Sequence, residues 1–438
     1  MSGEGFFTSK IFAVVGASRE EQKVGHAVFK NLLANKHILA LPVNPNAVEI
    51  LGKKCYKDLY EVPYNIDCVV IAVKAEFVLE VMRQAARRKV KNVVILSSGF
   101  SEAGNNKLEE EVKKIASDAG ISVIGPNAFG FVDCYKEVNT TFFEGIPPKG
   151  GIAFVSQSGA LGVGVLDLAL KDSIGMSAFV SLGISMNSDF SDFIEYFSKD
   201  RNTKVIALYM ESLKEARGKR FIETCLACKK PILVLKSGKT GSGERATKSH
   251  TSALASERGV YESVFKQAGL IEVSSMRELF KTAQALDKVG KIGKRAMIVT
   301  NAGGLGVLTS DALEKNGIDV VSLPEKIVEK FNKILPPGWS HNTPVDLIGD
   351  ALADRYWDVL SRLDAESWFD FFVVLLTPQN MTECEKTAEL LTHLKRPVFA
   401  IFYGGGKVDS SKKFLEARNI LVFDDAEDLG RVVGKIAG

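Results

Sequence analysis

Short apolar runs separated by helical patterns constrain the fold of this chain more than any other feature. In the first part of the chain the runs occupy residues 11–15, 38–43, 68–73, 92–97 and 121–124. Runs of this length that are apolar throughout are typical of strands buried on both faces. Because segments with helical patterning lie between them, the sequence predicts an α/β fold in which helices cover parallel sheets.

The same alternation continues through two further regions, so we expect three successive α/β domains. A chain of 438 residues is too long for one hydrophobic core. A Pro/Gly-rich junction at 144–151 and a Lys/Gly-rich junction at 288–295 divide it. We therefore predict domains at 1–146, 147–290 and 291–438. The later strands are expected at 151–155, 205–209, 231–235, 270–273, 296–300, 371–376 and 398–402.

Composition excludes several classes of protein. A net charge of +3 gives no reason to expect a nucleic-acid or membrane partner. Cys225 and Cys228 have CxxC spacing, but no second pair completes a zinc site, so we interpret them as packing residues and predict no metal site in this chain. No run is apolar enough to span a bilayer, and the first residues lack signal-peptide order. We therefore expect a cytoplasmic, reduced protein.

The turn after the first run indicates a nucleotide-type ligand. Gly16 follows the run directly, but the next glycine is Gly25, so the spacing is not GxGxxG. The second run ends at Asn44 without the acid that would bind the ribose 2′-hydroxyl of NAD. Coenzyme A, with its pyrophosphate and 3′-phosphate, fits these residues better than NAD. The glycines taken alone are equally compatible with ordinary turns.

A second candidate anion site follows the run at 151–155. Here Ser156, Gln157, Ser158 and Gly159 open a helical segment, and free N–H groups at a helix start attract anions. An ordinary N-cap is the alternative. Further on, Glu211 ends the run at 205–209, at the edge where parallel sheets bind ligands. Such a carboxylate could hold one nitrogen of a histidine, although most acids at strand ends are only solvated.

The histidine in question lies in the loop at 236–256, KSGKTGSGERATKSHTSALAS. This loop contains four basic side chains, one acid and His250. Imidazole is a good nucleophile near neutral pH, and a phosphoryl group on it would suit a basic, hydroxyl-rich loop. On composition alone, a solvated surface loop fits equally well.

Several short motifs in colinear order carry a family resemblance. They include Ser249-His250-Thr251, Gly125-Pro126-Asn127 and the NAGGLG segment at 301–306. Together they resemble the nucleoside-diphosphate-forming acyl-CoA synthetases, and within them the α subunits of ADP-forming acetate–CoA ligase, which are related to succinyl-CoA synthetase. The resemblance implies a Rossmann-like CoA-binding domain followed by two flavodoxin-like, succinyl-CoA-synthetase-like domains.

The resemblance also implies roles for particular residues. His250 would carry a phosphoryl group, with Glu211 as its partner, and the 156–159 segment would bind phosphate. Coenzyme A would be bound by residues near the ends of the first strands: Gly16, Ser18, Lys23, Val24, Asn44, Ala72, Val73, Ser98, Gly99 and Asn127.

Enzymes of this family need an ATP-grasp module, and none is found in this sequence. We therefore expect ATP or ADP and Mg²⁺ to bind on a separate β subunit, in an α2β2 assembly. Ser252, Leu305 and the segment at 183–186 depart from the family pattern, which weakens the transfer of acetate specificity. One rival is a CoA-binding regulatory or acyl-sensing protein without catalysis. Another is the relative in which this scaffold is fused to a protein acetyltransferase domain. We do not expect this relative, because the sequence ends at Gly438 and leaves no room for such a domain.

Overall fold

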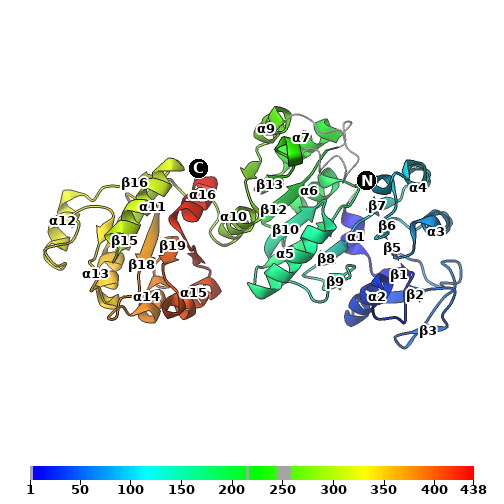
Figure 1. Ribbon diagram of the computed structural model, residues 1–438, viewed down its shortest axis with the longest axis horizontal. Coiled ribbons are helices and arrows are strands. Elements are labelled where there is room, and N and C mark those ends of the chain that lie inside the picture. The colour runs from blue at the N-terminus through cyan, green and yellow to red at the C-terminus, as the bar shows by residue number, and fades with distance from the viewer. Residues whose placement is uncertain (1–2, 214–216, 244–257) are drawn as a thin grey trace. The chain divides into compact units, whose positions relative to one another are not determined.

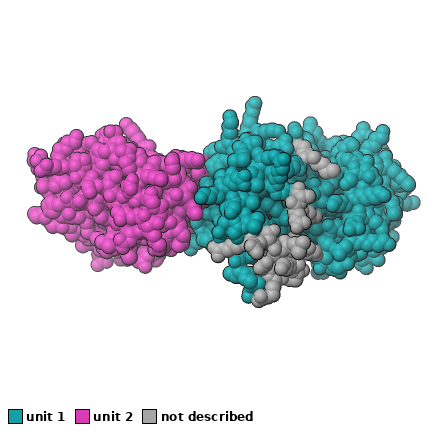
Figure 2. Space-filling view, turned by 90° about the horizontal axis from the view of Figure 1, so that it is seen from above, with its two compact units in different colours: residues 1–279 teal, residues 280–438 magenta. Residues whose placement is uncertain are grey.

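The structure is a computed structural model that describes residues 3–213, 217–243 and 258–438. It divides into two compact units, Met1–Leu279 and Phe280–Gly438 (Figure 2). The α/β architecture with helix-covered parallel sheets is confirmed. His250 and the centre of its loop lie outside the described residues.

The first sheet contains five parallel strands in the order β2-β1-β5-β6-β7 (Figure 1). Their bounds are β1 Ile11–Val15, β2 Leu39–Val43, β5 Cys68–Ile71, β6 Asn92–Ile95 and β7 Ser122–Ile124. The main helices around it are α2 Val24–Ala34, α3 Ala75–Arg87 and α4 Asn106–Ala119. A small hairpin, β3 Glu49–Ile50 with β4 Lys53–Lys54, follows β2.

Both faces of this sheet are buried, which explains why its strands are apolar throughout. Phe12 and Val14 of β1 belong to a core that includes Phe29 of α2. Ala13, between them, belongs to a different core that includes Met82 of α3. Alternate residues of one strand thus pack against different helices, as expected for a parallel sheet covered on both sides.

The second sheet contains seven strands in the order β14-β13-β12-β10-β11-β8-β9. Their bounds are β8 Gly130–Asp133, β9 Val138–Asn139, β10 Lys149–Ser156, β11 Met176–Ser181, β12 Val205–Met210, β13 Ile232–Lys236 and β14 Ile271–Val273. The helices are α5 Gly159–Lys171, α6 Phe190–Lys199, α7 Gly218–Ala227, α9 Arg258–Gln267 and α10 Met276–Lys288. The five strands from β10 onward are parallel, whereas β8 pairs antiparallel with β11 and with β9.

An N-terminal helix, α1 Glu4–Thr8, fastens the start of the chain to this second sheet. Phe6 and Phe7 of α1 are buried. The Phe7 ring stacks on Tyr196 of α6 with 4.6 Å between ring centroids and packs against Phe131 of β8 at 5.3 Å. The aromatic contacts join segments that are far apart in sequence.

The second unit contains the third sheet, whose main strands run in the order β16-β15-β18-β19-β20, with β17 pairing with the end of β15. Their bounds are β15 Arg295–Thr300, β16 Asp319–Val320, β17 Val345–Asp346, β18 Phe371–Leu376, β19 Val398–Phe402 and β20 Leu421–Val422. The helices are α11 Gly303–Lys315, α12 Glu325–Phe331, α13 Ala353–Asp364, α14 Cys384–Leu391, α15 Gly406–Ala417 and α16 Ala426–Ile436.

All three sheets share one winding rule. The first parallel strand of each lies inside the sheet, the second pairs on one side of it, and later parallel strands follow on the other side, except that the short strand β17 pairs with the end of β15 outside this order. The winding direction therefore reverses between β1 and β5, between β10 and β12, and between β15 and β18. Ligands bind α/β sheets at such switch points, outside the carboxyl ends of the strands.

Candidate functional site

A pocket of about 800 Å³ joins the switch points of the first two sheets within the first unit. The first sheet contributes residues that follow β5 and β6, including Ala72, Val73 and Ser98. The second sheet contributes the start of α5 and the residues that follow β12, including Gly159 and Glu211. Residues predicted separately to bind CoA and to transfer phosphate therefore line one pocket.

The turn after β1 is built by close backbone approach. Gly16 has φ +90°, and a Cβ there would lie 2.6 Å from the Ala72 carbonyl oxygen. A Cβ at Gly25 in α2 would lie 1.9 Å from the carbonyl oxygen of Gly16. Asn44 donates from Nδ2 to the Ala17 carbonyl at 2.8 Å. Only glycine fits at positions 16 and 25, and Asn44 holds the turn in place.

Five of the ten residues predicted to bind CoA line the pocket: Val24, Ala72, Val73, Ser98 and Asn127. The other five support or flank it. Besides Gly16 and Asn44, Ser18 accepts a hydrogen bond from the Glu20 amide at 3.0 Å. Exposed Lys23 lies 3.9 Å from the Glu20 carboxylate, and the Gly99 amide donates to Glu102 at 2.6 Å. CoA contact by each of the ten stays a prediction.

Helix α5 begins at an N-cap that provides a hydrogen-bond acceptor for only part of the N–H groups in its first turn. Ser158 is the N-cap, and its side chain accepts from the Leu161 amide at 3.3 Å. Buried Ser156 fixes this cap, since its hydroxyl accepts from the Ser158 amide at 3.1 Å. The first N–H groups of a helix have no intrahelical acceptor, and Gly159 and Ala160 at this start line the pocket. The arrangement is suited to an anion.

Gln157 connects the two strands that flank the switch point. Its Oε1 accepts from the amides of Glu211 at 2.7 Å and Ser212 at 3.0 Å, and its Nε2 donates to the Ser212 carbonyl at 3.0 Å. Both polar atoms of the Gln157 side chain therefore form hydrogen bonds with the residues that follow β12. Its predicted phosphate contact is untested, but the contacts show that Gln157 positions Glu211.

Glu211 is buried beside a second anchor, Lys236, which the sequence indicated only as one of the basic side chains of the loop at 236–256. The Nζ of buried Lys236, the last residue of β13, donates to the Glu211 carbonyl at 2.9 Å and lies 4.5 Å from the centroid of the Tyr261 ring. The Tyr261 hydroxyl accepts from the Leu213 amide at 3.0 Å. Burial, together with the Glu211 charge, raises the pKa of the Tyr209 phenol despite a Ser237 hydrogen bond. The carboxyl end of β12 is thus held rigidly from both sides.

The segment at 183–187 is tied to the first sheet by hydrogen bonds. The Ile184 amide donates to the Pro126 carbonyl at 2.9 Å, and Asn187 donates from Nδ2 to the Ile121 carbonyl at 2.8 Å. A Cβ at Gly183 would lie 2.2 Å from the Pro126 oxygen. Gly183 and Ile184, from the 183–186 segment predicted to depart from the family pattern, both line the pocket.

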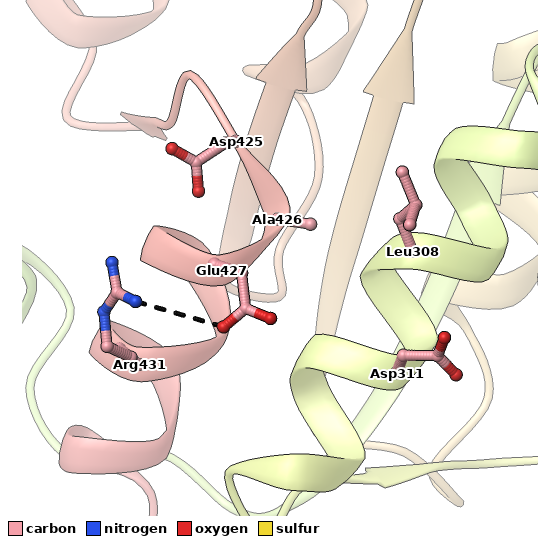
Figure 3. A pocket seen from close by; sticks show the side chains of 6 residues that line it. All are labelled: Leu308, Asp311, Asp425, Ala426, Glu427 and Arg431. Carbon is pink, nitrogen blue, oxygen red and sulfur yellow. Dashed lines mark ion pairs between the residues drawn. The ribbon is translucent and has the colours of Figure 1, made fainter.

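A different hollow of about 520 Å³ lies in the second unit between α11 and α16 (Figure 3). It presents the carboxylates of Asp311, Asp425 and Glu427, and its one guanidinium, Arg431, lies 3.9 Å from Glu427. An acidic lining repels polyphosphates, so this hollow does not suit CoA or a nucleotide.

The third sheet repeats the side-chain bridge of the second. Asn301, after β15, accepts from the Thr377 amide at 2.9 Å and donates to the Thr377 carbonyl at 2.9 Å. The bridge connects β15 to β18 as Gln157 connects β10 to β12. The NAGGLG segment therefore lies at the switch point of its sheet.

Among the helices in the described ranges, none has the length and apolarity needed to cross a membrane.

Comparison with protein families gives three matches along the chain. A CoA-binding domain matches residues 10–133, a succinyl-CoA ligase-like flavodoxin domain matches 149–286, and a ligase-CoA domain matches 296–425. The chain is 36% identical to the Pyrococcus furiosus acetate–CoA ligase [ADP-forming] II subunit alpha, over 97% of this chain and 95% of that one.

Of two other relatives, one is longer than this chain and one matches it over nearly its full length. It is 38% identical to acetate–CoA ligase [ADP-forming] I of Archaeoglobus fulgidus, over 96% of this chain but only 61% of that protein. Its fold matches acetyl-coenzyme A synthetase 1 of Ca. Korarchaeum cryptofilum, solved with phosphate and ADP, with a TM-score of 0.93 and 34% identity over 98% and 94% of the two chains.

Proposed function

Because this chain belongs to the family of ADP-forming acetate–CoA ligase α subunits, we propose that it is the CoA-binding subunit of an acid–CoA ligase. The reaction interconverts acyl-CoA, ADP and phosphate with a carboxylic acid, CoA and ATP. The observation that carries the proposal is the pocket shared by the first two switch points, which Ser98 and Asn127 line together with Gly159 and Glu211.

The first-sheet half of the pocket fits coenzyme A. Gly16 and Gly25 pack the turn after β1 closely against Ala72 and the start of α2, which fixes the backbone beside Val24, Ala72 and Val73 of the pocket lining. Lys74, Ser97, Ser98 and Asn127 supply a cation, hydroxyls and an amide for a polar ligand that carries phosphates. Bound there, CoA supplies the thiol that becomes acylated or released.

The second-sheet half would carry the phosphoryl chemistry. Phosphate attacks the acyl-CoA carbonyl to give acyl phosphate and CoA, and His250 then takes the phosphoryl group and releases the acid. Amides at the start of α5 would neutralise phosphate charge, and the Glu211 carboxylate would hold the imidazole tautomer. Gln157 and Lys236 keep Glu211 in place, which favours phosphoryl transfer because this reaction depends on positioning and charge.

The phosphoryl group on His250 would pass to ADP on a separate ATP-grasp β subunit, which would also hold Mg²⁺. We propose an α2β2 assembly. We further propose that the division at 1–146, 147–290 and 291–438 describes the functional domains. Strands β8 and β9 come from the first of these segments and complete the sheet of the second, so these two would not separate on partner binding.

The requirement for a partner is testable directly. We expect the purified chain, given acetate or another acid with CoA and ATP, to form no acyl-CoA above the blank. Adding its β subunit should raise synthesis at least about a hundredfold, because nucleotide binding and phosphoryl transfer then become coupled. The β subunit alone is the control. Strong ATP-dependent synthesis by the partner-free chain would contradict the proposal, and inactivity with every acid tried on the mixture would favour a CoA-binding regulator.

A further inference from the structure

The second-sheet half of the pocket carries an apolar wall that the proposed phosphoryl chemistry does not use. The wall, which we call the phenyl wall, consists of Phe129, Phe142, Ala160 and Val163. The rings of Phe129 and Phe142 meet edge to face, with 4.4 Å between centroids and 80° between planes. Phe129 is buried, but Phe142 is 41% exposed although it is a large apolar side chain.

The exposed ring of Phe142 is held in place by its own loop. Asn139 donates from Nδ2 to the carbonyls of Phe143 and Gly145, both at 3.0 Å. Asn31, from α2, donates to the Thr141 carbonyl at 2.8 Å. Side-chain hydrogen bonds to the backbone on either side of Phe142 therefore fix its loop. An apolar group ordered in this way can bind a ligand with little further loss of conformational freedom.

Its neighbour Phe129 is fixed just as firmly against the start of α5. The Phe129 amide donates to the Ser181 hydroxyl at 2.9 Å. A Cβ at Gly159 would lie 3.2 Å from the Phe129 Cβ, so the first residue of α5 packs directly on it. The phenyl wall thus adjoins the helix start that would bind phosphate, and Ala160 and Val163 extend it along the first turns of α5.

The two halves of the pocket differ in chemistry. The first-sheet half offers Lys74, Ser97, Ser98 and Asn127, which suit the amides and phosphates of CoA. The phenyl wall offers no charge and no hydroxyl. A ligand group that packs there gains free energy in proportion to its apolar area, and an aromatic ring gains further from edge-to-face contact with Phe142.

We propose that the phenyl wall receives the side chain of the carboxylic acid, and that the preferred acid carries an aryl or bulky branched apolar group rather than the single methyl of acetate. This inference depends on the proposed function, since it takes CoA to lie in the first-sheet half. A methyl group would leave most of the wall exposed to water. Arylacetic acids supply both the apolar area and a carboxyl group set one carbon away from the ring.

The test is calorimetric titration of the purified chain with CoA, acetyl-CoA and phenylacetyl-CoA. Phenylacetyl-CoA should bind at least about tenfold more tightly than acetyl-CoA, a factor typical of one extra apolar group in a pocket. Phe142→Ala should remove most of that advantage and leave CoA affinity within about twofold. Val163→Ala, on the same wall, should remove a smaller part. Phe77→Ala is the matched control, because Phe77 is 55% exposed on α3 and lies outside the pocket.

Each outcome decides a different claim. Equal affinity of the wild-type chain for the two acyl-CoAs would overturn the acid preference and leave the proposed function standing. If Phe142→Ala weakened CoA and both acyl-CoAs by the same factor, the wall would hold the pantetheine arm and the inference would be wrong. If the wild-type chain bound none of the three, the proposed function itself would fail. With the β subunit present, kcat/KM for phenylacetate over acetate should follow the same order.

Discussion

His250→Ala should abolish both phosphoryl labelling of the chain and turnover of the assembled ligase. With acyl-CoA and radioactive phosphate, the wild-type chain should acquire a phosphoryl group that is labile in acid and stable in base, as expected for a phosphoramidate. Removing the nucleophile should lower turnover at least about a thousandfold, since the proposed carrier of the phosphoryl group is then missing. Affinity for CoA should stay nearly unchanged, because the residues proposed to bind CoA surround the ends of other strands.

Two variants make that experiment specific. His37→Ala removes an exposed histidine outside the pocket and should leave labelling intact. Glu211→Gln keeps the size and the backbone bonds to Gln157 but loses the charge that would fix the imidazole, so it should slow labelling without preventing it. Full turnover of His250→Ala with its β subunit would mean that this loop does not carry the phosphoryl group.

Gly25→Ala should disrupt the CoA half of the pocket more than a methyl group added at any other glycine. The added Cβ would lie 1.9 Å from the Gly16 carbonyl oxygen, so either the turn after β1 or the start of α2 has to move. Backbone displacement of this kind lowers the free energy of unfolding by about 3 kcal/mol. Urea denaturation and CoA titration should show the two losses together.

Gly164→Ala is the matched control for that change. Gly164 lies in α5, and a Cβ there meets no atom within 4 Å. Replacing an exposed helical glycine with alanine should raise the free energy of unfolding by roughly 0.5 to 1 kcal/mol. If Gly25→Ala behaved like Gly164→Ala, the close contact between the turn and α2 would not be required.

The local hydrophobic pattern was sufficient to predict the bounds of strands that are apolar from end to end. The predicted runs at 11–15, 371–376 and 398–402 match β1, β18 and β19 residue for residue. By contrast, β11 was missed because Ser177 and Ser181 interrupt its apolar pattern. Both serines are buried and satisfied by partners distant in sequence, Ser177 by Thr203 and Ser181 by Phe129. A strand stabilised in this way has no local signature.

The sequence predicted individual residues of the candidate site better than it predicted how these residues are arranged in space. Motifs placed Glu211 and Gly159 at the ends of separate strands, and the winding of the second sheet brought those ends together. The bridge made by Gln157 and the buried ammonium of Lys236 were not anticipated, because each acts through backbone atoms of a strand that is distant in sequence. Phe142 was also overlooked, because the sequence does not show which exposed aromatic residues line a pocket.

Hydrogen–deuterium exchange of the purified chain, without ligand, with CoA and with CoA plus phosphate, tests the central claim that one pocket unites the first two switch points. CoA should protect peptides that follow the first-sheet strands, at 72–75 and 96–98, and added phosphate should extend the protection to the start of α5 at 157–161. NAD should leave exchange unchanged, and so should CoA at α11 and α16, where the hollow is acidic. CoA protection confined to α11 and α16, or no protection of the start of α5 when phosphate is added, would contradict the account.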